Sequence, residues 1–282
     1  MIYSPEDRAI CETLLKSARE RKERVKPFNE LVLAAGRHFL NAPYEPDTLE
    51  GEGPEELVVN LRTFDCVTFV ENAVVLAGLI RSGKTSFADF AAALNRMRYR
   101  RGRCDGYASR LHYFTDWIDD NGRKGLVQDI TREIGGIPFR KTLYCLTDRR
   151  EDHPGLKDPR DFRRLRIIEG TCSRRPLFFI PKASLERAGD GITDGDIIAL
   201  TTDERGLDVS HTGLAVRIGG QLHLLHASSA AGKVVLSETT LSRYLQARRS
   251  RTGIIVSRAI PPMAAESDGA RRPAPSRPPS RK

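Results

Sequence analysis

The chain has 282 residues, of which 39% are hydrophobic and 29% charged, a balance that excludes a wholly disordered protein and allows one large domain or two small ones. Its longest apolar run, residues 73–80, is far shorter than the roughly 20 residues that a membrane-spanning helix needs. The net charge of +9 favours anionic partners without identifying one. The five cysteines form no C-x-x-C pair, which argues against a zinc knuckle, and their odd number leaves at least one free thiol.

The first hundred residues predict a series of helices. The expected helices cover residues 4–24, 28–40, 65–81 and 86–98, with a loop at 43–54 and a short extended segment at 57–61. Ser4 is suited to cap the first helix, and Gly83 is suited to end the third in a left-handed conformation. Residues 103–117 mix aromatic and polar side chains, so we expect an exposed or site-lining segment. The strongly charged residues 148–170 predict an excursion on the surface.

The last third of the chain changes to short alternating runs that predict strands. These strands are expected at residues 177–180, 196–200, 211–218, 222–226, 234–236 and 253–256, with a short helix at 238–247. The pair Gly219-Gly220 predicts a two-residue hairpin turn. Helices followed by an antiparallel sheet indicate an α+β fold. Residues 261–282 hold six prolines and predict a disordered tail after a folded domain at 1–260.

Cys66 is a candidate nucleophile because it falls at the start of the predicted helix 65–81. A helix N-terminus carries partial positive charge and unsatisfied N–H groups, and both lower the pKa of a thiol. The alternative is a buried cysteine that packs as a small hydrophobic residue, the commonest fate of a free thiol.

His211 and His226 are candidates for a base and for the group that orients it. Pairing through the Gly219-Gly220 turn brings both to the same end of the predicted hairpin. His223 has the opposite parity to His226, so we expect it on the other face of the sheet. The alternative is that both histidines are structural and hydrogen-bonded at the end of the sheet.

Two further patterns suggest other functions. Residues 78–85 satisfy the P-loop string G-x-x-x-x-G-K-[ST], yet they also continue the predicted helix 65–81, with Gly83 as its cap and Lys84 as a solvated residue. The basic run 96–103 is compatible with phosphate binding or with the solvated end of a helix. We favour the structural interpretation of both, and expect no nucleic-acid partner.

The order of these motifs resembles the NlpC-type papain-like cell-wall hydrolases, and most closely the N-acetylmuramoyl-L-alanine amidase-like family. The resemblance covers roughly residues 8–258. It rests on the strings Pro43-Tyr44, 65–72 (DCVTFVEN), 109–117 (SRLHYFTDW), 195–198 (GDII), 210–213 (SHTG) and 225–227 (LHA).

This resemblance implies a papain-like core with the N-terminal helices packed on an antiparallel sheet. It implies Cys66 as nucleophile, His211 as its acid–base partner and His226 as the residue that fixes the His211 tautomer. Tyr44 is expected beside the nucleophile. Arg110 and Tyr113 are expected to contact the substrate, since an arginine can hold a stem-peptide carboxylate through two hydrogen bonds.

The implied reaction needs no metal or other cofactor and cleaves the amide between N-acetylmuramic acid and L-alanine in peptidoglycan or soluble muropeptides. The same three residues would also serve a γ-D-glutamyl-diaminopimelate endopeptidase of this clan. A non-enzymatic cell-wall binding module and a P-loop nucleotide-binding protein are alternatives from other classes. The family implies the cell envelope, although no apolar run typical of a signal peptide occurs in the first 30 residues. The sequence leaves the oligomeric state open.

Overall fold

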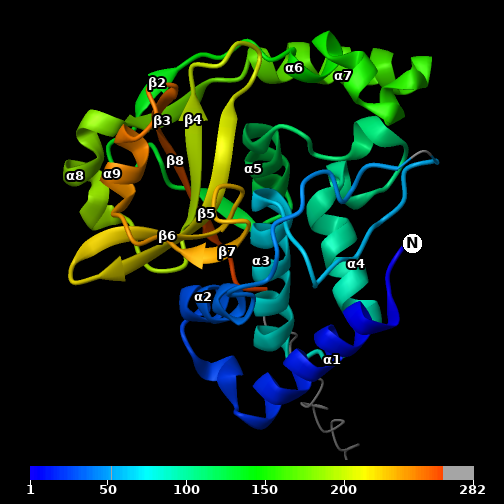
Figure 1. The fold of residues 1–282 in the computed structure, drawn as a ribbon, viewed down its shortest axis with the longest axis vertical. Helices are drawn as coiled ribbons and strands as arrows, with labels where there is room; N and C mark the ends of the chain where they lie inside the picture. The colour runs from blue at the N-terminus through cyan, green and yellow to red at the C-terminus, as the bar shows by residue number, and fades with distance from the viewer. Residues whose placement is uncertain (52, 263–282) are drawn as a thin grey trace, which may run out of the picture.

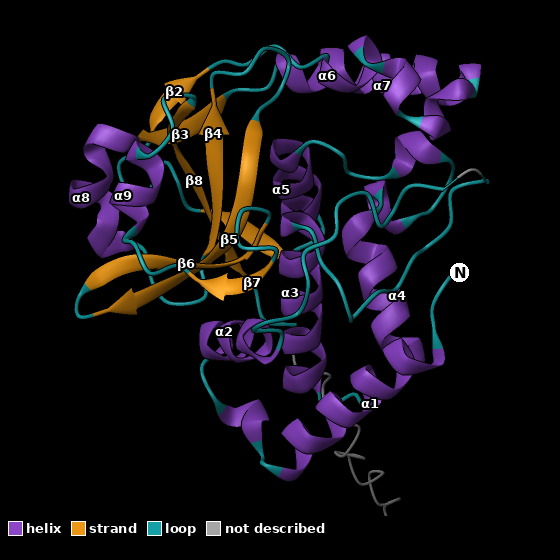
Figure 2. Cartoon of the chain, in the orientation of Figure 1, coloured by secondary structure: helices purple, strands orange, loops and turns teal. Residues whose placement is uncertain are grey.

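The computed structural model describes residues 1–51 and 53–262, so residues 263–282 of the predicted tail lie outside the described part. An antiparallel sheet carries helices on both faces (Figure 1). The helices α2 and α3 pack on one face, and α8 and α9 cover the other (Figure 2). This arrangement confirms the mixed α+β fold with helices on an antiparallel sheet.

The N-terminal helices form close to where the sequence predicts them. They are α1 (Pro5–Glu20), α2 (Phe28–His38), α3 (Cys66–Ser82), α4 (Phe87–Arg98) and α5 (Phe114–Arg123). Ser4 caps α1 through a reciprocal capping box with Asp7. The predicted end of this helix is too late, because α1 ends at Glu20 and a separate 3₁₀ turn follows at Glu23–Val25.

The strands form one sheet in the described part of the chain. They are β1 (Val127–Asp129), β2 (Ile137–Phe139), β3 (Leu177–Pro181), β4 (Ile197–Thr202), β5 (Val209–Ile218), β6 (Gln221–Ser228), β7 (Lys233–Leu236) and β8 (Arg251–Ala259). Their order is β2-β3-β8-β4-β5-β6-β7, with β1 also paired to β8, and each pair is antiparallel. The strands β1 and β2 were not predicted, because three residues are too few to display an alternating pattern.

The hairpin of β5 and β6 sets which side chains face each side of the sheet. Gly219 and Gly220 have φ of +57° and +82°, the left-handed conformations that a type I′ turn requires. The resulting register places Leu214 opposite Leu225. These two leucines belong to the core shared with α2 and α3, whereas their neighbours Ala215 and Leu224 belong to the core shared with α9.

The remaining helices are short except for one, and they are α6 (Cys145–Asp148), α7 (Pro159–Ser173), α8 (Leu185–Ala188) and α9 (Leu241–Gln246). The charged segment expected on the surface contains most of α7, which nevertheless anchors itself by burying Leu165. Among the described residues, no helix has the length and apolar character required to cross a membrane.

The segment 103–117, expected to be exposed or site-lining, is largely buried. Trp117 and Tyr107 belong to hydrophobic clusters, and the polar atoms of the buried aromatic residues have internal partners. The Trp117 indole N–H, for example, donates to Glu71 at 3.1 Å. Aromatic rings interspersed with polar residues can therefore fill a core when each polar atom finds a partner there.

The P-loop string lies at the end of a helix. Helix α3 continues through Gly78 to Ser82, and Gly83 ends it with φ of +70°. Lys84 forms an ion pair with Asp89 at 2.7 Å. A phosphate-binding loop needs free backbone N–H groups between a strand and a helix. The nucleotide-binding alternative is therefore wrong for this segment, whose N–H groups are used by the helix and its cap.

A buried ion pair between Glu71 of α3 and Arg98 of α4 offers a test of this packing. The Arg98 Nε lies 2.8 Å from Glu71 Oε2, and both residues are almost fully buried. Glu71→Gln would leave the guanidinium without its counter-charge, so we expect the free energy of unfolding to fall by about 3–5 kcal/mol in urea titrations. Glu12→Gln, which removes the exposed pair with Arg8, should produce no measurable change. Equal effects of the two substitutions would contradict this assignment.

Candidate active site

Cys66 occupies the first position of α3, and a capping box fixes it there. The Asp65 carboxylate accepts hydrogen bonds from the N–H groups of Val67 at 2.9 Å and Thr68 at 2.7 Å. In return, the Thr68 hydroxyl accepts from the Asp65 N–H at 3.0 Å. This reciprocal cap satisfies orphan donors of the first turn and defines where the helix begins. Cys66 is thereby held at the helix N-terminus, as predicted.

The thiol of Cys66 lies beside the backbone of β5. The N–H groups of Thr212, Cys66 and Val67 point at the sulfur and lower its pKa. Burial has the largest influence, however, and together with the Asp65 carboxylate it raises the pKa of Cys66 to about 12. The expectation that the helix N-terminus gives a lowered thiol pKa is thus corrected, because desolvation outweighs it. A neutral thiol at neutral pH needs a base to become a nucleophile.

His211 and His226 lie together, at the end of the hairpin where the sequence placed them. The His211 Nε2 and His226 Nδ1 atoms are 2.6 Å apart, and the rings are nearly perpendicular at 85°. Gly213 makes this contact possible, because a Cβ atom there would lie 2.8 Å from the His226 Cβ. His223 takes no part, since its Nδ1 donates to the Ser237 carbonyl at 2.9 Å.

The imidazole pair leaves one nitrogen of His211 for chemistry. With Nε2 engaged by His226, Nδ1 is the remaining site for a proton. The neighbouring residue, Thr212, directs its N–H at the Cys66 thiol, so the thiol lies beside the residue that follows His211 on β5. Within residues 1–51 and 53–262, no hydrogen bond joins the thiol to either imidazole.

An aromatic and cationic wall backs the two histidines. Tyr244 of α9 lies 5.3 Å from the His226 ring, and the Arg251 guanidinium of β8 stacks 4.0 Å from the centre of the Tyr244 ring. Burial, followed by the charge of Arg251, lowers the pKa of His226 to about 4. Burial, His226, Arg251 and Arg248 lower the pKa of His211 to about 3. Both rings are therefore neutral near pH 7.

Tyr44 lies close to Cys66, in the loop that precedes α3. Its N–H donates to the Gly232 carbonyl at 2.9 Å, which ties the loop to the end of the sheet. Burial raises the pKa of Tyr44, and the nearby Cys66 and Asp65 raise it further. The phenol therefore stays protonated and can donate a hydrogen bond at the site.

The polar groups of Arg110 and Tyr113, which were expected to contact the substrate, have partners within the protein. The Arg110 guanidinium is 5% exposed and pairs with Glu50 at 2.5 Å, while its Nη1 donates to the Leu49 carbonyl at 2.8 Å. The Tyr113 hydroxyl donates to Glu169 at 2.7 Å. Arg110 thus anchors the loop after Tyr44, and its fork is occupied by the protein itself.

Tyr244 and Arg251 were not predicted to lie at the site. Neither belongs to a motif, and each lies on an element that meets the histidines only in the folded chain. In the part of the chain that the structure describes, His, Cys, Asp and Glu side chains form no cluster of three or more that could hold a metal ion.

The chain is similar in sequence and in fold to an amidase-like class of hydrolase. The model of the AmiA-like, N-acetylmuramoyl-L-alanine amidase-like family matches residues 34–254. The chain belongs to this family, whose activity implies a substrate related to peptidoglycan.

Solved structures agree with this assignment. An N-acetylmuramoyl-L-alanine amidase from Bacteroides uniformis is 37% identical with a TM-score of 0.77, over 82% of this chain and 98% of that one. A Bacteroides fragilis structure named as a "putative xylanase" is 42% identical with a TM-score of 0.75, over 80% and 99%. A Legionella pneumophila protein at 23% identity, with a TM-score of 0.65 over 90% and 97%, shares the fold. No curated protein matches the chain.

The neutral histidines predict a pH dependence of stability. In the unfolded chain each imidazole takes up a proton near its ordinary pKa of 6.5, whereas the folded protein resists protonation down to about pH 4 and 3. Lowering the pH from 6.5 to 4 should therefore reduce the free energy of unfolding, by at most about 1.4 kcal/mol per pH unit for each histidine. Urea titrations at stepped pH values measure this slope.

The same titrations of the double variant His211→Gln/His226→Gln are compared with those of the wild type. The variant should show a shallower loss over the same pH range, because it lacks both groups, while the buried His112 still contributes in each protein. Parallel curves for the wild type and the double variant would contradict the burial of two neutral imidazoles.

Proposed function

We propose that the protein is a cysteine hydrolase that cleaves the amide between N-acetylmuramic acid and L-alanine of the peptidoglycan stem peptide. The observation that carries the proposal is the 2.6 Å contact between His211 Nε2 and His226 Nδ1. His211 lies on β5 next to Thr212, whose N–H reaches the Cys66 thiol. In this proposal the nucleophile lies at a helix N-terminus, and the base and its orienting group lie on two adjacent strands. This arrangement also supports placement in the NlpC-type papain-like clan.

The chemistry begins with a proton transfer. The His211 Nε2–H donates to His226, so Nδ1 is unprotonated and takes the proton of the Cys66 thiol as sulfur attacks the lactoyl carbonyl. The Cys66 N–H at the start of α3 is positioned to stabilise the oxyanion. Nδ1–H then protonates the L-alanine amine, which leaves with the peptide.

The thioester that remains holds the sugar on Cys66. Water loses a proton to His211 Nδ1 and attacks the thioester carbonyl, after which sulfur leaves as thiolate and regains the proton. His226 stabilises the imidazolium in both halves of the reaction. No step uses a metal, so activity is expected to persist in EDTA.

The name of the Bacteroides fragilis neighbour raises glycoside hydrolysis as a second reaction. That chemistry generally uses two carboxyl groups about 5–10 Å apart across the glycosidic bond. Around the histidine pair, the described side chains are instead Tyr244, Arg248 and Arg251, and the Asp65 carboxylate is occupied by the helix cap. The site therefore favours an amide substrate. The γ-D-glutamyl-diaminopimelate bond is the alternative amide, since the same three residues would cleave it.

The test is mass spectrometry of disaccharide-peptide muropeptides incubated with purified protein in EDTA. Wild type should release free disaccharide and intact stem peptide. Cys66→Ala should lower the rate by roughly 10⁴-fold or more, because it removes the nucleophile. His226→Ala should lower kcat by about 10²- to 10⁴-fold, because the base loses its fixed tautomer.

His223→Gln provides a matched control, since it lies on the same strand as His226 but faces the other side of the sheet. It should retain near wild-type kcat. Release of a product from the distal stem would move the cleaved bond to γ-D-glutamyl-diaminopimelate. A Cys66→Ala protein as active as wild type would refute the cysteine mechanism.

A further inference from the structure

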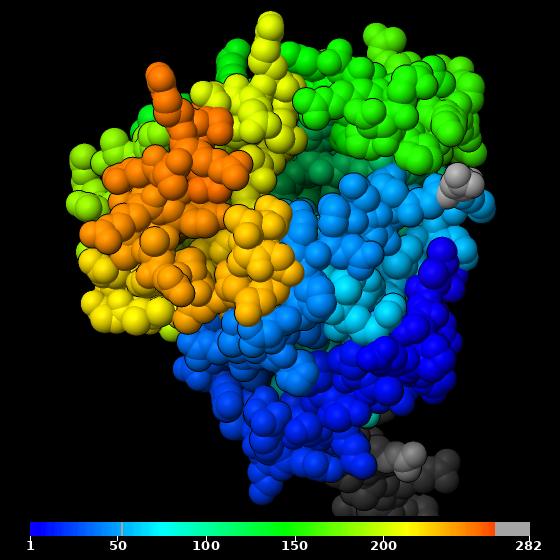
Figure 3. Space-filling view, viewed as in Figure 1, coloured from blue at the N-terminus to red at the C-terminus, as the bar shows by residue number. Residues whose placement is uncertain are grey.

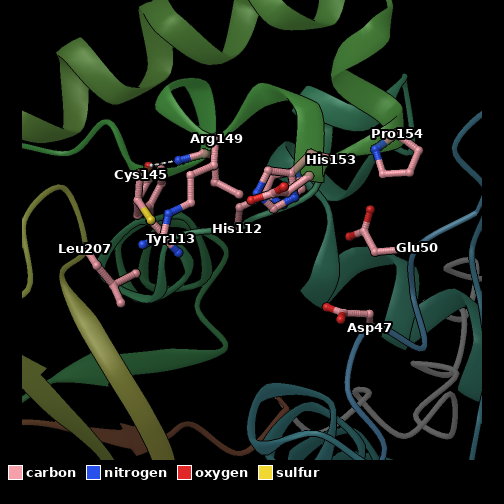
Figure 4. A pocket seen from close by; sticks show the side chains of 11 residues that line it. Asp47, Glu50, His112, Tyr113, Cys145, Arg149, His153, Pro154 and Leu207 are labelled. Carbon is pink, nitrogen blue, oxygen red and sulfur yellow. Dashed lines mark hydrogen bonds between the residues drawn. The ribbon is translucent and has the colours of Figure 1, made fainter.

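A cavity of about 460 Å³ lies next to the candidate site and has no role in the chemistry described above. Among its lining residues are Asp47, Tyr113, Cys145, Arg149, His153 and Leu207 (Figure 4). They come from the loop after Tyr44, the start of α5, the segment from α6 to α7 and the β4–β5 loop. The molecular surface is hollowed where these segments meet (Figure 3).

Two loops connect the lining of this cavity to the candidate site. Asp47 is close enough to Tyr44 to raise the pKa of its phenol, and Tyr44 in turn lies beside Cys66. Leu207 precedes His211 by four residues. Between them, Asp208 accepts hydrogen bonds from the Thr115 N–H at 2.8 Å and hydroxyl at 2.6 Å, which fixes this loop against α5. The loop that carries Tyr44 and the loop that precedes His211 thus both contribute residues to this cavity.

The free charges in the cavity have opposite signs. Arg149 and Asp47 are exposed, and each lacks an ion pair among the described residues. Figure 4 shows them on different sides of the cavity. Asp47 has a left-handed backbone conformation with φ of +57°, a region that aspartate tolerates better than most residues do. Asp152 adds a second exposed carboxylate to the lining.

The other polar groups in the lining are already engaged. The Glu50 carboxylate pairs with Arg110 at 2.5 Å. His112 bonds to the Tyr107 carbonyl at 2.8 Å, and His153 to the Tyr107 hydroxyl at 3.2 Å. Tyr113 and Leu207 supply apolar surface between the charges. The cavity therefore offers one guanidinium, free carboxylates and an apolar floor.

We propose that this cavity binds the distal part of the stem peptide at a residue whose side chain carries both a carboxylate and an ammonium group, as that of a diamino diacid does. Arg149 holds the carboxylate through its planar fork, and Asp47 receives the ammonium group. This inference rests on the proposed function. Arg110 is paired with Glu50 and Glu55 inside the protein, so Arg149 replaces it as the residue that binds the carboxylate.

The test is isothermal titration of free stem tripeptides into the full chain carrying Cys66→Ala, which prevents turnover. One tripeptide ends in meso-diaminopimelate and the other in L-lysine, which keeps the amine but lacks the second carboxylate. Cys66→Ala should bind the diaminopimelate peptide more tightly. Adding Arg149→Gln should lower the affinity for that peptide by about 10- to 100-fold and leave the affinity for the lysine peptide unchanged. Adding Asp47→Asn should lower the affinity for both peptides.

Arg163→Gln is the matched control, because Arg163 is an exposed arginine of α7 outside the cavity lining. It should leave both affinities unchanged. Equal weakening of both peptides by Arg149→Gln, or no weakening, would overturn the proposal.

The muropeptide cleavage assay of the otherwise wild-type protein separates the two hypotheses. Cleavage together with unselective Arg149→Gln binding overturns the subsite alone. Selective binding without cleavage supports the subsite and overturns the proposed reaction.

Discussion

The antiparallel register of β5 and β6 is the constraint on which the site depends. A two-residue turn at Gly219-Gly220 fixes this register, and a slip by one residue would send every side chain of a strand to the opposite face. With the observed pairing, His211 and His226 share the face covered by α9, and the Thr212 backbone meets the N-terminus of α3. The pairing of β5 with β6 thus determines where the imidazole pair lies and which part of β5 meets the Cys66 thiol.

Burial governs the electrostatics of this site more than the helix N-terminus does. The first turn of α3 offers its N–H groups to Cys66, yet desolvation raises the pKa of the thiol and lowers the pKa of both histidines. Each group therefore rests in its neutral form. The proposed reaction starts from neutral partners and depends on moving a proton during the attack, and this proposal assigns to His226 the role of fixing the His211 tautomer.

The loop between Tyr44 and α3 connects the catalytic residues to the rest of the molecule. Arg110 holds this loop in place by pairing with Glu50 and donating to the Leu49 carbonyl, while Asp47 of the same loop is exposed. A buried arginine with both partners supplied by the protein is a structural anchor, and an exposed arginine across the cavity is available to a ligand.

The sequence by itself determined the helices before residue 100, most strands of the sheet, the hairpin turn and the pairing of His211 with His226. These features follow from local signals, namely apolar periodicity, capping residues and a glycine turn that fixes distances along the chain. It could not assign β1 and β2, because segments of three residues carry no period.

Only the tertiary structure decided which polar residues are buried and with whom they pair. The internal pairing of Arg110, the wall formed by Tyr244 and Arg251, and the raised thiol pKa arise from contacts between distant segments. Desolvation depends on everything packed around a group, and no short motif records it. Residue order was sufficient to nominate the catalytic groups, and packing set their protonation states and neighbours.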